Sequence, residues 1–113
     1  MDQNGQEELD APTQNSEQEV YILRLYITGM TPNSKKAVEN VKKICEQHLK
    51  GKYELEVIDI YQQPTLAQQE QIIAAPTLVK KLPGPLRKLI GDMSNTEKVL
   101  VGLGLRTKET NGS

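Results

Sequence analysis

The sequence contains no Trp and no Phe, and its 113 residues include a single cysteine, Cys45, and a single histidine, His48. The only aromatic residues are tyrosines, so the core of a folded domain has to be mainly aliphatic. One cysteine excludes an internal disulfide, which is typical of a protein from the reducing cytosol. One cysteine and one histidine are also too few for a zinc site built from nitrogen and sulfur ligands. We therefore expect no metal and no cofactor.

Long hydrophobic runs are missing as well. No stretch approaches the roughly 20 apolar residues that a membrane-spanning helix needs. The first residues have neither the basic region nor the apolar region of a secretory signal. The length allows one domain at most. We therefore expect a single cytoplasmic domain that has no membrane partner.

Basic residues are absent from residues 1–19, which hold six of the 15 acidic residues. The rest of the chain has the other nine acids and all 14 bases, a balance of +5. We predict a disordered acidic tail over 1–19, a folded domain over 20–105 and a flexible tail over 106–113. A basic domain favours an acidic partner. Nucleic acid is not the partner that we expect, because no aromatic residues interleave with the lysines to stack on bases.

The predicted domain begins with a strand and a long helix. Residues 20–28 alternate apolar side chains on one face, as a half-buried strand does. Thr31 is a good N-cap, and Pro32 suits the first position of a helix. Apolar residues then recur at helical spacing up to Gly51, and they include Cys45 and His48. We expect Cys45 to be a small core residue.

A second strand is predicted over residues 53–61, and its nearly continuous apolar end indicates cover on both faces. Together with the preceding strand and helix it makes a right-handed βαβ unit. A short helix is predicted to begin at Pro64 and to run through Ile73. Thr65 and Gln68 have the spacing of a capping box for it.

The second half of the domain is less determined by its sequence. Residues 77–82 indicate a strand, and Pro-Gly-Pro at 83–85 indicates a turn. Residues 86–90 are compatible with either a strand or a turn of helix. These alternatives stay open at the level of the sequence.

The last segment carries two contradictory signals. Ser94 and Glu97 have the spacing of a capping box, which predicts a helix from Asn95. The run that follows includes Gly102 and Gly104, each of which would cost a helix interior about 1 kcal/mol relative to alanine. The same run also alternates as a strand does. Conflicting local signals of this kind weaken the specification of a unique structure.

The expected order of elements, βαβαββα, is that of a thioredoxin-like α/β fold. Pro76, just before a predicted strand, stands where such folds place a cis-proline. A redox-active member would carry Cys-x-x-Cys at the first strand–helix junction, where the helix N-terminus lowers a thiol pKa. That junction, residues 29–34, contains no thiol. Disulfide exchange by this chain alone is therefore excluded, and we expect it not to be an enzyme.

Four blocks of sequence, in order along the chain, resemble the KaiB family of circadian clock proteins. The blocks are LYITGMTPNS at 25–34, VIDI at 57–60, APTL at 75–78 and IGDMSNTEKVL at 90–100. The resemblance covers residues 21–105. It implies a protein that is not an enzyme and that binds the ring-shaped, RecA-like ATPase KaiC and, in clocks, then recruits KaiA. The family resemblance also implies two folds, a tetrameric ground state and a thioredoxin-like monomer, between which the second half of the chain rearranges.

The resemblance leads to specific expectations for sites. Homo-oligomerisation as a dimer or tetramer is expected, with Tyr21 at the interface, and Pro76, Gly102 and Gly104 are expected to govern the change of fold. Replacing either glycine with alanine would then favour the helical state. The residues that we expect to contact the partner are Lys35, Lys36, Glu54, Glu56 and Lys80; ordinary solvated charges are the alternative for each.

Some positions depart from the clock proteins that this chain resembles. Those proteins tend to have Lys at the position of Glu56 and Asp at that of Gly104. Such differences leave the fold intact, and they make a related role in signalling or stress adaptation an alternative to a role in a clock. The alternatives are a redox-inactive thioredoxin-fold adaptor for another protein, or a fragment of a glutathione-dependent transferase. The latter would need a catalytic residue at the first junction and a second domain.

Overall fold

A computed structural model describes residues 19–105, so the tails predicted over 1–19 and 106–113 lie outside the described residues, apart from Glu19. The elements are β2 (Tyr21–Ile27), α1 (Pro32–His48), β3 (Tyr53–Asp59), α2 (Pro64–Gln69), β4 (Thr77–Leu82), β5 (Arg87–Ile90) and α3 (Thr96–Gly102). The predicted order βαβαββα is confirmed. Within the described part, no helix is long and apolar enough to cross a membrane.

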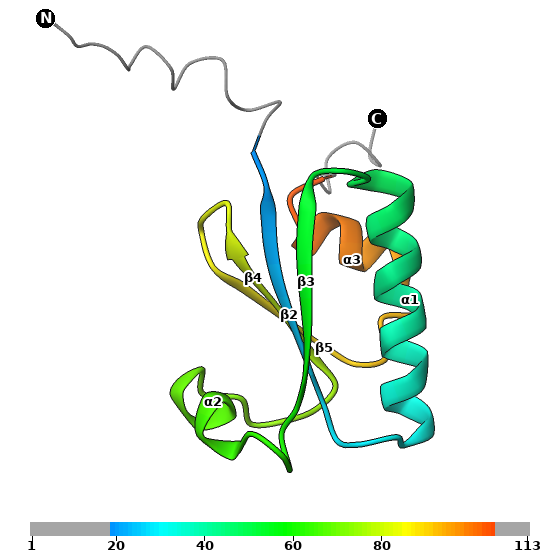
Figure 1. The fold of residues 1–113 in the computed structure, drawn as a ribbon. Coiled ribbons are helices and arrows are strands. Elements are labelled where there is room, and N and C mark those ends of the chain that lie inside the picture. Colours follow the sequence, from blue (N-terminus) through cyan, green and yellow to red (C-terminus); the bar gives the residue numbers. More distant parts are fainter. Residues whose placement is uncertain (1–18, 106–113) are drawn as a thin grey trace, which may run out of the picture.

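The sheet has four strands in the order β3-β2-β4-β5. Strands β2 and β3 are parallel, as a βαβ unit requires, whereas β4 is antiparallel to both β2 and β5. Helices α1 and α3 lie on one face of this sheet and α2 lies on the other (Figure 1). The edge strands are therefore β3 and β5, and the chain's second half joins the first along the boundary between β2 and β4.

The alternation predicted for β2 is confirmed by its burial. Leu23 and Leu25 face α1 and α3 and are buried, while Tyr26 is buried on the opposite face. Helix α1 begins as predicted, because the Thr31 side chain accepts a hydrogen bond from the Ser34 backbone N–H and Pro32 is the first helical residue. The loop between β2 and α1, residues 28–31, therefore lies at one end of the sheet.

Two cores of different size hold the layers together. The larger lies between the sheet and helices α1 and α3, and the smaller lies beneath α2. Aliphatic side chains dominate both, as the composition predicts. The fully covered members of the smaller core are Tyr26, Ile58, Ala67 and Val79.

Four predictions for the first half are wrong in detail. His48 is exposed at the end of α1 rather than part of its apolar face. Strand β3 is not covered on both faces, because it is an edge strand: Ile58 is buried, but Val57 stays 38% exposed. Helix α2 ends at Gln69 instead of reaching Ile73, since Gln71 adopts a left-handed backbone with φ of 60°. Its N-cap is Gln63, which makes no side-chain capping bond, so the predicted capping box is not formed.

The structure also resolves the open alternatives of the second half. Residues 87–90 form strand β5, and the final segment is helical as far as Gly102. The capping residue is Asn95, one position later than the predicted Ser94, and its side chain accepts a hydrogen bond from the Lys98 backbone N–H at 3.1 Å. Gly104 follows the helix with φ of +80°, a conformation that L-residues rarely adopt.

Candidate functional site

The first strand–helix junction is organised by hydroxyl groups that act structurally. Ser34 is fully buried, and its Oγ accepts a hydrogen bond from the Thr28 backbone N–H at 3.1 Å. The Thr31 hydroxyl caps the helix. Both side chains that could be mistaken for nucleophiles are therefore occupied in holding the loop. The hydrogen bonds described for the Ser34 and Thr31 hydroxyls, in this part of the chain, join them to the backbone and to Thr28 and not to a side chain that could act as a base.

Cys45 is expected to be chemically inert. It is fully buried on α1, and this burial, assisted by the nearby Glu46 carboxylate, raises the pKa of its thiol to about 12. At neutral pH almost no thiolate is present, and the thiolate is the reactive form. We therefore expect no insulin reduction above background, with identical traces from the wild type and Cys45→Ser. Turnover that the serine variant abolishes would contradict this assignment.

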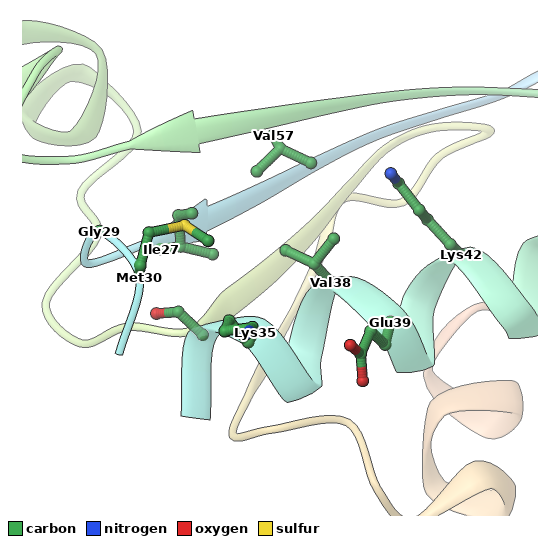
Figure 2. Close-up of a pocket in the computed structure, with 9 residues that line it drawn as sticks. Ile27, Gly29, Met30, Lys35, Val38, Glu39, Lys42 and Val57 are labelled. Atoms are coloured by element: carbon green, nitrogen blue, oxygen red, sulfur yellow. The ribbon is translucent and has the colours of Figure 1, made fainter. Parts of the chain in front are cut away.

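An apolar hollow opens where α1 passes over the edge of the sheet. Its volume is about 330 Å³. The floor and walls come from Ile27 at the end of β2, Val38 on α1 and Val57 on β3, and Met30 projects from the loop between β2 and α1 (Figure 2). The Met30 side chain is 75% exposed, which is unusual for a long apolar side chain. We call these four residues and this hollow the α1–β3 groove.

Charged side chains on α1 form the rim of the groove. Lys35, Glu39 and Lys42 all line it, and Figure 2 shows them along the same helix as Val38. An apolar centre with a charged rim is the usual anatomy of a protein-binding surface. The described residues offer no group of three or more His, Cys, Asp or Glu that could hold a metal ion. The arrangement fits recognition of a protein better than chemistry on a small molecule.

The predicted contact residues are only partly brought together. Lys35 lines the α1–β3 groove, and Lys36 is its exposed neighbour on α1. Glu54 and Glu56 lie on β3 beside the groove, but they point to the other face of the sheet, where Glu56 pairs with Arg24. The edge strand thus presents apolar residues on one face and carboxylates on the other.

Lys80 is not a surface residue. It is 5% exposed on β4 and lies across from Leu23 and Arg87 in the sheet. Burial, and secondarily the charge of Arg87, lowers the pKa of its ammonium group. Because β4 is an inner strand, Lys80 is not exposed in this fold, and its predicted contact with a partner stays a prediction.

The remaining predicted positions lie apart from the groove. The Ala75–Pro76 peptide bond is cis and immediately precedes β4. Tyr21 is half-buried at the start of β2 and packs against the larger core. Gly102 lies against Leu89 of β5, and Gly104 follows α3. The structure neither joins these residues into one site nor tests their predicted roles.

The apolar residues of the α1–β3 groove were missed by the reasoning from sequence. Met30 looked like part of a turn, and Val57 looked like an ordinary strand residue. The one signal in the sequence is Met30, a large apolar side chain at a loop position. A loop residue has no neighbours in a helix or strand of its own to pack against, so such a side chain indicates an exposed apolar surface. The predicted contacts Lys35 and Lys36, which follow from the family resemblance, are charged residues on α1 and include none of these apolar side chains.

Comparisons with known proteins support the fold and give the chain a family. Residues 24–105 match the KaiB domain. The chain is 52% identical over 91 residues to the circadian clock oscillator protein KaiB of Trichodesmium erythraeum, covering 80% of this chain and 88% of that protein. The N-terminal domain of Synechococcus elongatus SasA superposes with a TM-score of 0.63 at 25% identity, covering 79% of this chain and 88% of that domain. Mitochondrial thioredoxin 3 of Saccharomyces cerevisiae superposes with a TM-score of 0.62 at 19% identity, over 77% of this chain and 79% of that one, which shows the thioredoxin-like fold alone.

Proposed function

Because this chain belongs to the KaiB family of circadian clock proteins, we propose that it is a non-enzymatic regulatory protein that binds a KaiC-like ATPase of the RecA type. Binding would serve circadian timing or a related role in signalling or stress adaptation. Recruitment of KaiA to the resulting complex is part of the same proposal. A redox-inactive adaptor for a different protein remains the alternative.

The α1–β3 groove is the observation that carries this proposal. Exposed apolar side chains cost solvation free energy unless a partner covers them, so a cluster of them indicates an interaction surface. Met30 and Val57 supply that surface, and Lys35 stands at its rim. The neighbouring charges would set the orientation and the association rate of the partner.

Self-association is a separate part of the proposal. The family resemblance implies a dimer or tetramer, and Tyr21 is the interface residue that we propose. In the single chain its side chain is half-buried at the start of β2, so part of it is open to a second copy. Light scattering at tens of micromolar tests this point, and a monomer would count against it.

A direct binding experiment tests the main proposal. The full chain would be incubated for many hours with a purified KaiC-like ATPase and nucleotide at low salt, and complex formation would be followed by fluorescence anisotropy. We expect binding that weakens as salt rises, because charges at a rim are screened. Lys35→Glu should weaken it, whereas Lys43→Glu should not, since Lys43 is equally exposed on α1 but lies outside the groove. No complex with the wild type would overturn the proposal.

A further inference from the structure

Four charged side chains alternate in sign across the face of the sheet that carries α2. The Lys81 ammonium on β4 lies 3.1 Å from Oε1 of Glu70, just after α2. The same oxygen lies 3.5 Å from a terminal nitrogen of Arg24 on β2. The Nε of Arg24 in turn lies 3.3 Å from Oε1 of Glu56 on β3. We call Lys81, Glu70, Arg24 and Glu56 the charge line.

Glu70 is the most protected member of the charge line. Its side chain is 12% exposed, against 58% for Glu56 at the outer end. The Tyr26 hydroxyl donates a third hydrogen bond to the same Glu70 oxygen, at 3.2 Å. Burial alone would raise the pKa of Glu70, but Lys81, Tyr26 and Arg24 together outweigh it and lower the pKa. Charge pairs shielded in this way are stronger than fully solvated surface pairs.

The backbone next to Glu70 is tied to the sheet as well. The Lys88 ammonium on β5 donates to the Glu70 carbonyl oxygen at 2.6 Å and to that of Gln71 at 3.4 Å. Residues from β2, β4 and β5 therefore all converge on the end of α2. Together with the smaller core beneath α2, Glu70 attaches the α2 segment, residues 64–72, to the sheet.

We propose that Glu70 is a positioning residue for the β3 edge: it holds Arg24, and Arg24 holds Glu56 on the face of β3 opposite to the groove. Contact of a partner with Glu56 is thereby coupled to the attachment of the α2 segment. This inference rests on the proposed function, because it assumes that a partner engages the β3 edge. The coupling is reciprocal. If a cationic group of the partner binds Glu56 in place of Arg24, Arg24 stays paired with Glu70 alone. This would strengthen the attachment of the α2 segment to the sheet.

Glu70→Gln in the full chain tests the positioning step without any partner. The change removes the charge while it keeps the size of the side chain. We expect the protected Nε–H signal of Arg24 in ¹⁵N NMR spectra to lose its protection. The amide of Ile72, which is bonded to the Ala67 carbonyl, should exchange with solvent roughly tenfold faster. Gln69→Ala is the matched control, because it alters an exposed neighbour at the same end of α2.

The same variants test the coupling when a KaiC-like ATPase is added. Glu70→Gln should weaken binding about three- to tenfold, Gln69→Ala should not, and Glu70→Asp should recover part of the loss because it restores the charge. If Arg24 and Ile72 behave alike in Glu70→Gln and the wild type, the inference is overturned whatever the binding result. If they respond as expected but the wild type binds no ATPase, the proposed function fails, and the positioning of Glu56 stands.

The pH dependence of this attachment has a definite sign. A carboxylate whose pKa is lowered by folding stabilises the folded state fully above its ordinary pKa, about 4.3, and the stabilisation is lost as the pH falls through the lowered value. The groups that face Glu70 are Arg24 and Tyr26 from β2, Lys81 from β4 and Lys88 from β5. We therefore expect the exchange rates of wild type and Glu70→Gln to differ at pH 6 and to converge in acid. A difference that persists once the Glu70 carboxyl is protonated would contradict the role of the charge.

Discussion

Val57→Asp is expected to weaken binding of a KaiC-like ATPase at least 30-fold. The change places a carboxylate at the centre of the α1–β3 groove, where an approaching apolar surface would have to desolvate it. Folding should survive, because Val57 is 38% exposed on an edge strand and Lys35 and Lys42 lie around the same hollow. Fluorescence anisotropy at fixed salt measures the loss, and circular dichroism checks the fold.

Ile73→Asp is the matched control for Val57→Asp. Ile73 is 91% exposed beyond the end of α2 and takes no part in the groove, so the same exchange of aliphatic for acid should leave binding within about twofold. Met30→Asp provides a second variant in a loop, should Val57→Asp fail to fold. Equal binding by the wild type and both groove variants would show that the partner docks elsewhere.

Gly104→Ala is expected to lower the free energy of unfolding of this fold by about 1 kcal/mol. The expectation from sequence had the opposite sign, because it placed Gly104 inside a helix. Helix α3 ends at Gly102, and Gly104 has φ of +80° with nothing within 4 Å of the position of a Cβ atom. The cost is therefore one of backbone conformation alone. Urea denaturation measures it, and Gly104→Asn, which tolerates this conformation better, should cost less.

Gly102→Ala needs a second substitution to be understood. A Cβ atom there would clash with a methyl group of Leu89, so the Leu89 side chain has to move. This opposes the gain in helix propensity of up to about 1 kcal/mol. In a Leu89→Ala background we expect the full gain to appear, and the difference between the two backgrounds is the coupling that a double-mutant cycle measures. If the effects of Gly102→Ala and Leu89→Ala on the free energy of unfolding are additive, the Leu89 side chain moves aside without an energetic cost.

The two glycine variants also test the predicted change of fold. If the second half has an alternative arrangement, Gly104→Ala should raise its population. Leu89→Ala should also raise it, because Leu89 packs against the larger core, and adding Gly102→Ala should lower it relative to Leu89→Ala alone. NMR spectra over a dilution series would show two sets of peaks whose ratio follows these changes. A single set of peaks, identical in every variant, would leave this chain with one fold.

Local patterns predicted the elements of the first half because each signal there is contained within its own segment. The alternation in β2 and the Thr31–Pro32 start of α1 need no distant residue. The groove could not be predicted in the same way, since Met30 and Val57 meet only after β3 has paired with β2. The charge line is harder still, because Arg24 and Glu70 are 46 residues apart. The burial of Lys80 could not be predicted either, since its charge indicates the surface and only the strand order makes β4 an inner strand.

The boundary between β2 and β4, where the two halves of the chain join, has a consequence for tyrosine fluorescence. All four tyrosines precede residue 62, so intrinsic fluorescence originates entirely in the first half of the domain. Tyr53 donates its hydroxyl to Glu46 on α1 and therefore senses only that half. Tyr26 is different: it lies beside β4 in the sheet and its hydroxyl reaches Glu70. Detachment of the α2 segment should change the emission of Tyr26 through the loss of this hydrogen bond, which makes Tyr26→Phe the blank for a spectroscopic measurement of that motion.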